Sequence, residues 1–155
     1  MPSRRIMGQV RAKPCTRPEC IPRSRPRGVK ALGLRYERAL ARALPHGRHG
    51  PWYEFIDANG PGYCQPDIVL DMGECMFVLE SKLSNVEQAK AQIEDLYVPV
   101  LTAAHRTKVH GIIVVRHLTP GVDLALVHDT LQSAMIAAVR GSQLPLLHWL
   151  GRGRL

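Results

Sequence analysis

The pattern of apolar and polar residues along this 155-residue chain alternates between helical and extended periods, which predicts a single α/β domain. Apolar residues recur every three or four positions over 29–44, as in an amphipathic helix. A second helix is expected from Ser84 or Asn85 to about Tyr97, because Pro99 follows.

Strands are predicted by short runs rich in β-branched and aromatic residues. These runs are 52–57, 68–70, 75–79, 109–115 and 144–150, with a third helix over 129–140. Helix, three strands, helix, strand, helix and strand then form a three-layer sandwich over residues 29–155, with a mixed central β-sheet flanked by helices. Residues 1–28 are rich in Pro and Arg, which predicts an extended or disordered basic arm.

Residues 65–82 carry charged side chains inside what should be a buried sheet, and this segment is the most informative of the chain. A turn over 71–74 makes the flanking runs a hairpin in which Asp67 lies opposite Val78. Side chains alternate along a strand, so Glu80 points to the same face as Asp67. A slip of one residue would put the two carboxylates on opposite faces.

The shared face predicts a divalent-cation site made by Asp67 and Glu80. Like charges buried on neighbouring strands repel, and each loses its hydration, so a cation would offset both costs. Mg²⁺ prefers oxygen ligands and completes its shell with water and phosphate oxygens. Lys82 faces the same way, where its ammonium group could orient a water nucleophile or stabilise charge on a phosphate.

The order Pro66-Asp67, twelve residues, then Glu80-Ser81-Lys82 resembles the signature of the PD-(D/E)XK nuclease superfamily. The resemblance implies a restriction-endonuclease-like core and hydrolysis of phosphodiester bonds with Mg²⁺ or Mn²⁺. Carried over by position, it implies that Asp67 and Glu80 are metal ligands, with the backbone carbonyl of Ser81 as a further ligand. Lys82 takes the place of the catalytic lysine.

Members of the superfamily often add an acidic residue from a helix before the hairpin and a Gln from the helix after it. Glu37 matches the first position as a further catalytic residue that could also bind the metal; its alternative role is a surface pair with a neighbouring Arg. Gln92, or Gln88, matches the second position, unless both face solvent. Gln92 followed by Tyr97 is similar to the Gln…Tyr pairing of exonuclease branches, with one residue more between them.

Positive charge is concentrated at the start of the chain. Residues 1–30 hold nine Lys or Arg and one Glu, which accounts for the net charge of +8. Such a segment suits salt-sensitive contacts with a phosphate backbone, and its alternative role is that of a solvated tail. The nucleic-acid-binding candidates are Arg4, Arg5, Arg11, Lys13, Arg17, Arg23, Arg25, Arg27, Lys30 and Arg35.

Cysteine usage and hydropathy narrow the class of protein. No apolar run approaches the roughly 20 residues of a membrane helix, and no secretory signal is evident, so a cytoplasmic protein without a membrane partner is expected. The four cysteines show no disulfide framework. Cys15 and Cys20, with His46 and His49 downstream, could bind zinc or remain free thiols.

The predicted function is that of a divalent-metal-dependent DNA endonuclease. Small size, a Glu-Arg helix near the start and a short Asp-to-Glu spacing are similar to Holliday junction resolvases and to small nucleases of phages and mobile elements. This similarity implies a preference for branched DNA, or a weak sequence preference, and a homodimer. The alternatives are an exonuclease of the same superfamily, an RNA nuclease, and a non-catalytic nucleic-acid-binding module on an inactive nuclease-like fold.

Overall fold

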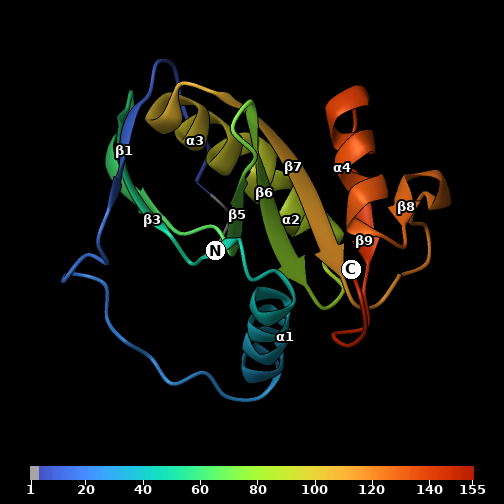
Figure 1. Cartoon of the computed structure of the whole chain (residues 1–155). Helices are drawn as coiled ribbons and strands as arrows, with labels where there is room; N and C mark the ends of the chain where they lie inside the picture. The colour runs from blue at the N-terminus through green and yellow to red at the C-terminus, as the bar shows by residue number, and fades with distance from the viewer. Residues whose placement is uncertain (1–3) are drawn as a thin grey trace.

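The computed structural model describes residues 4–155 and confirms a mixed α/β fold (Figure 1). Residues 1–3 of the expected basic arm lie outside the described residues. Six strands form the central sheet in the order β2-β5-β6-β7-β9-β8. β5 and β6 pair in antiparallel fashion, whereas β6, β7, β9 and β8 run parallel, so the sheet is mixed as expected.

The predicted helices and strands are all present, although the last strand is shorter than expected. The strands of the central sheet are β2 (Arg48–His49), β5 (Ile68–Asp71), β6 (Cys75–Lys82), β7 (Lys108–Val115), β8 (Val127–His128) and β9 (Leu146–His148). The helices are α1 (Val29–Ala43), α2 (Val86–Gln92), α3 (Val98–His105) and α4 (Leu131–Arg140), with a π-helical turn η1 (Ile93–Tyr97) and a 3-10 turn η2 (Leu124–Leu126). Within residues 4–155, no helix has the length and apolarity to span a bilayer.

Helices cover both faces of the central sheet, which explains the nearly continuous apolar run of β7. Ile112 and Val114 belong to a core cluster with residues of α1 and α4. Ile113 and Val115, which point the other way, belong to a second cluster with α2, η1 and α3. The sheet therefore lies between two helical layers, each with its own core.

The helix expected to end near Tyr97 continues to His105, so the expected end was wrong. Asn85 caps the helix as expected, accepting a hydrogen bond from the Gln88 backbone N–H at 3.0 Å. The π-helical turn η1 widens the helix, and Pro99 follows in the first turn of α3. A proline is tolerated there, because the missing N–H removes little from the hydrogen-bond ladder of a new helical segment.

A second sheet of three antiparallel strands was not expected from the sequence. It consists of β1 (Arg11–Cys15), β3 (Trp52–Asp57) and β4 (Gly60–Cys64), with β3 in the centre, and Figure 1 places it beside α3. Its outer strands are difficult to read from the sequence, since β1 contains a proline and the glycines of β4 suggest a turn. Gly62 is required in β4, because a Cβ there would lie 2.6 Å from the Phe55 ring.

The segment before α1 differs in part from the free arm that the sequence suggested. Arg11–Cys15 pairs with β3, and Arg4 is fixed to Asp57 by an ion pair of 2.7 Å. The Met7 backbone N–H donates to the same carboxylate at 2.9 Å. Between β1 and α1 the chain forms no helix or strand. Its first part therefore packs on the domain, and only the later part remains a connecting segment.

Two glycine substitutions are predicted to change stability in opposite directions. Gly111 of β7 lies against the side chains of Ile93 and Leu144, and a Cβ there would overlap Ile93. Gly111→Ala should therefore lower the free energy of unfolding by about 1–3 kcal/mol through overpacking. Gly33→Ala in α1 adds a Cβ in open space and should raise it by about 0.5–1 kcal/mol. Urea unfolding at neutral pH measures both; equal stability of Gly111→Ala and wild type would contradict the packing.

Candidate functional site

The turn of the β5–β6 hairpin lies one residue further along than expected. Asp71 pairs with Met76, and the loop is Met72–Cys75, closed by a hydrogen bond of 3.0 Å from the Met72 backbone N–H to the Cys75 carbonyl. Gly73 adopts φ of +84° in this loop. The expected turn over 71–74 was therefore wrong, and the register of the hairpin is shifted by two residues.

A shift of two residues still leaves Asp67 and Glu80 on the same face of the hairpin, because side chains on a strand alternate between faces with a period of two. Ile68 pairs with Leu79, so Asp67, one residue before β5, lies opposite Glu80 instead of Val78. Directly opposed residues lie closer than diagonal neighbours. In the observed register, the two acidic positions therefore lie nearer to each other than the sequence suggested.

Ser81 fixes the carboxylate of Asp67. The Ser81 backbone N–H donates to Asp67 Oδ2 at 2.7 Å, and the Ser81 hydroxyl donates to the same oxygen at 2.6 Å. The sequence had assigned Ser81 only a carbonyl ligand, which stays a prediction, and it missed the role of these two donors. Burial raises the pKa of Asp67, and the hydrogen bonds from Ser81 oppose that rise.

Glu80 has a buried carboxylate, of which only one oxygen has a partner. The residue is 2% exposed, and its Oε1 lies 2.9 Å from Lys82 Nζ. Glu80 Oε2 is buried and has no hydrogen-bond partner in the described part of the chain. Burial, and then the charge of Asp67, raise the pKa of Glu80 to about 8, although Lys82 lowers it. Such a group needs either a proton or a cation.

Glu37 reaches the same region from α1. Glu37 Oε1 lies 3.0 Å from His49 Nε2, at hydrogen-bond distance, and Glu37 forms no ion pair with an Arg among residues 4–155, so the alternative of a surface pair with a neighbouring Arg was wrong. Burial and then Asp67 raise the pKa of Glu37, whereas His49 and Lys82 lower it. These influences show that Glu37 lies within electrostatic reach of Asp67 and Lys82.

A cleft of about 490 Å³ between α1 and the start of α2 brings these groups together. Glu37, Asp67, Ser81 and Lys82 line it. Glu80 is not part of this lining, and it lies behind Lys82, away from water. Lys82 therefore connects an open cleft to a buried carboxylate.

Gln92 and Tyr97 form the pair that the sequence indicated, and the structure explains their unusual spacing. The Gln92 amide donates to the Tyr97 hydroxyl at 3.2 Å, and the hydroxyl donates to the Gln65 carbonyl at 3.4 Å. The π-helical turn η1 absorbs the extra residue, because its bonds join residues five apart. Burial and then Glu80 raise the pKa of Tyr97. Gln88, in contrast, is exposed at the rim of the cleft.

The donor chemistry of the cleft fits a hard divalent cation, but not a cage of three protein ligands. Within residues 4–155, no three His, Cys, Asp or Glu side chains lie close enough together to hold a metal ion. Mg²⁺ commonly takes one or two carboxylates and completes its shell with water and phosphate oxygens. Asp67 and the unpartnered Oε2 of Glu80 are suitable oxygen donors for such a site.

The zinc site considered for Cys15 and Cys20 is not formed in the described part of the chain either. Neither cysteine belongs to a metal-binding group in the described residues, and all four cysteines are free thiols. His49, one of the two downstream histidines, is bound to Glu37 instead.

Several of the basic candidates make contacts within the chain. Arg4 pairs with Asp57, Arg5 with Asp95 at 3.8 Å, and Lys13 with Glu54 at 2.8 Å, whereas Arg17 lies over the Trp52 ring. The candidates without an acidic partner among residues 4–155 are Arg11, Arg17, Arg23, Arg25, Arg27, Lys30 and Arg35. Lys30 lines the cleft that contains Asp67.

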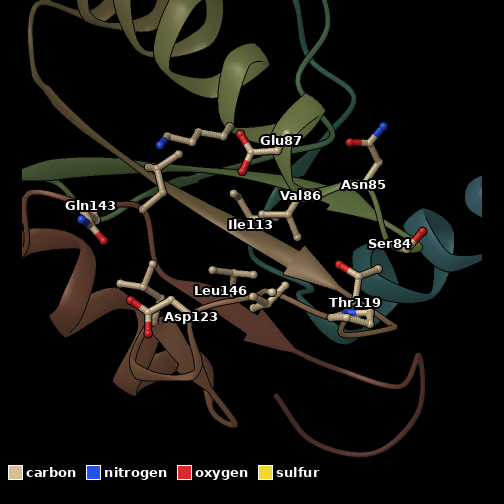
Figure 2. Close-up of a pocket in the computed structure, with 15 residues that line it drawn as sticks. Ser84, Asn85, Val86, Glu87, Ile113, Thr119, Asp123, Gln143 and Leu146 are labelled. Carbon is tan, nitrogen blue, oxygen red and sulfur yellow. The ribbon is translucent and has the colours of Figure 1, made fainter.

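A second cleft of about 420 Å³ lies beyond the start of α2 (Figure 2). Figure 2 shows Ile113 and Leu146 at its floor, with Glu87, Asp123 and Gln143 among the polar side chains around them. None of the candidate catalytic residues lines it. Of these two clefts, only that of Asp67 and Lys82 is lined by candidate catalytic residues.

Comparisons of the chain with protein-family models, with curated proteins and with solved structures gave no match.

The raised pKa of Glu80 predicts that the folded state loses stability as the pH rises. Between the ordinary value of 4.5 and about 8, folded Glu80 holds a proton that the unfolded chain releases. This contribution is complete below pH 4.5 and is lost through about pH 8, with a slope of at most about 1.4 kcal/mol per pH unit. Burial of Asp67 and Glu37 acts in the same direction.

Urea unfolding in EDTA between pH 5.5 and 8.5 measures this dependence. Glu80→Gln removes the titrating group and should give a shallower slope than wild type, whereas the exposed control Glu87→Gln should not. Parallel slopes for wild type and Glu80→Gln would contradict a buried, proton-holding carboxyl.

Proposed function

We propose that this chain is a divalent-metal-dependent nuclease that hydrolyses DNA phosphodiester bonds on a restriction-endonuclease-like core. The observation that supports the proposal most is the buried Glu80, whose Oε2 has no partner, directly opposite Asp67 and 2.9 Å from Lys82 Nζ. A buried carboxylate next to a half-buried one, with one lysine between them and water, is costly for stability alone. This cost is understandable if the site binds a cation and a phosphate.

Each residue of the cleft has a distinct part in this proposal. A bound Mg²⁺ or Mn²⁺ ion would supply positive charge next to the carboxylates and to a phosphate oxygen. Asp67 is held in one orientation by Ser81, and Glu80 is kept dry by the core, so both are preorganised. Lys82 places a donor at the cleft, where it can orient the attacking water or a phosphate oxygen.

Glu37, Gln92 and the Ser81 carbonyl have supporting roles in the proposal. Glu37 lines the cleft and is a further carboxylate that can orient water, whereas its predicted place as a metal ligand beside Asp67 and Glu80 would need a group of three ligands that residues 4–155 do not form. Gln92 lies behind the site, where it positions Tyr97 close to Glu80. The Ser81 carbonyl remains a proposed ligand.

The substrate is proposed to be DNA, cut with a structural or weak sequence preference. The candidate cleft is a single groove on one domain, without a separate reading domain in residues 4–155. A homodimer would supply a second cleft for a branched substrate. The free cysteines suit a reducing environment inside the cell.

A second candidate function is that of an exonuclease with the same chemistry. The hydrogen bond between Gln92 and Tyr97, at 3.2 Å, favours it, because this pair is similar to one found in exonuclease branches. A non-catalytic nucleic-acid-binding module is the remaining alternative, and it needs no joint role for Asp67, Glu80 and Lys82.

Cleavage of DNA with Mg²⁺ or Mn²⁺ tests the proposal. Wild type should cut at least one of a panel of supercoiled, linear, single-stranded and four-way-junction DNAs, and EDTA should abolish cutting. Lys82→Ala and Asp67→Asn should each lower the rate by at least about 100-fold, since each removes a preorganised group at the reacting phosphate.

Lys90→Ala is the control, because Lys90 is exposed on α2 and lines the cleft of Figure 2 instead. Its rate should match that of wild type. If wild type and both site variants bind DNA equally and none cuts any DNA of the panel with either metal, the binding module is the correct function. Cutting that begins only at free ends would select the exonuclease.

A further inference from the structure

A basic cleft lies next to the candidate catalytic cleft, on the other side of α1. Its volume is about 520 Å³, and Arg35, Arg116, His117 and Arg152 line it. No Asp or Glu is among the residues that line it. The cleft is therefore a concave surface of one charge sign, which attracts anions more strongly than isolated surface lysines would.

The three guanidinium groups are not used within the chain. Among residues 4–155, Arg35, Arg116 and Arg152 have no ion pair and no side-chain hydrogen bond. Arg116 is half-buried, so its charge is also partly removed from water. Like charges that lie close together without acidic partners repel one another and lower the stability of the fold. A bound anion would offset this repulsion.

The fold fixes the position of this charge through the C-terminal segment. The Trp149 backbone N–H donates to the Val115 carbonyl at 3.0 Å. The Tyr36 hydroxyl donates to the Trp149 carbonyl at 2.7 Å, and the two rings lie 5.6 Å apart. Gly151, with φ of +84°, then turns the chain against Tyr36, and Arg152 follows. The hydrogen bonds of Trp149 to Val115 and Tyr36 therefore fix the chain just before Arg152.

The basic cleft is continuous in structure with the candidate catalytic site. The Arg116 backbone N–H donates to the Lys82 carbonyl at 3.2 Å, so the end of β7 lies beside the end of β6. On α1, one stripe lines the catalytic cleft and the neighbouring stripe, which includes Arg35, lines the basic cleft. Figure 1 shows α1, the ends of β6 and β7 and the C-terminal segment at the same end of the molecule.

We propose that the basic cleft binds the phosphodiester backbone of the nucleic acid beside the phosphate to be cleaved. Guanidinium groups match phosphate oxygens in charge and in hydrogen-bond geometry, and Arg is the preferred residue for this purpose. The inference rests on the proposed function for its substrate, but it concerns binding and not chemistry. Within the N-terminal segment, in contrast, Arg4 and Lys13 are already occupied by acidic partners.

Binding of a short fluorescein-labelled DNA duplex in EDTA, measured by anisotropy over a range of salt concentrations, tests this proposal without cleavage. The variant carries Arg35→Gln, Arg116→Gln and Arg152→Gln together. Its affinity at 0.1 M salt should fall at least about tenfold, and the slope of log K against log salt should decrease by about 2–3, close to 0.9 for each phosphate contact.

The matched control carries Arg38→Gln, Arg42→Gln and Arg140→Gln, which removes the same charge from exposed helical positions outside the cleft. Its affinity should change by less than about threefold. Equal losses in the two triple variants, or no loss in the cleft variant, would overturn the proposal. Should the cleft variant fail to fold, the exposed Arg152→Gln replaces it, with an expected slope decrease of about 1.

The two proposals fail in different ways. If wild type binds through these arginines but never cuts DNA, the nuclease is wrong and the cleft stands. If wild type cuts DNA and the cleft variant retains its KM and kcat, the nuclease stands and the cleft is wrong.

Discussion

The half-buried carboxylate of Asp67 and the buried carboxylate of Glu80 lie opposite each other on adjacent antiparallel chain segments at one end of the central sheet, and the rest of the site is arranged around that constraint. Burial raises the pKa of both carboxyls, and the charge of Asp67 raises that of Glu80 further. Ser81 provides two hydrogen bonds to Asp67, and Lys82 provides one charge to Glu80. One buried oxygen remains without a partner, and this deficit is the physical basis for proposing a cation.

The helix α1 organises the surface around these carboxylates. One side of it carries Glu37 into the candidate catalytic cleft, and the adjacent side carries Arg35 into the basic cleft. A cleft that contains two carboxylates and two lysines is thus separated by a single helix from a cleft whose charged residues are all basic. This arrangement suits a polyanion whose backbone is held by arginines while one of its phosphates lies near the carboxylates and Lys82. The three arginines of the basic cleft come from distant parts of the sequence, so this cluster of positive charge is assembled by folding.

Much of the fold was predictable, because helices and strands of the central sheet follow strong hydrophobic periods. The face shared by Asp67 and Glu80 was also predictable, since it depends only on parity and survived an error of two residues in the hairpin register. Other features depend on tertiary contacts. The strand β1 is an edge strand that pairs only because β3 is present, and His49 reaches Glu37 only through the two-residue strand β2. The π-helical turn, which carries Tyr97 to Gln92, leaves no reliable signal in a single sequence.

We propose that Glu80 holds a proton until a divalent cation replaces it, and titration of its side-chain carboxyl by carbon NMR measures this exchange. Without divalent cation, the pKa of Glu80 should be near 8. With saturating Mg²⁺, this pKa should decrease by several units, because the bound charge favours the carboxylate. A pKa near the ordinary value of 4.5 that does not respond to Mg²⁺ would show that Glu80 neither holds a proton nor binds the cation.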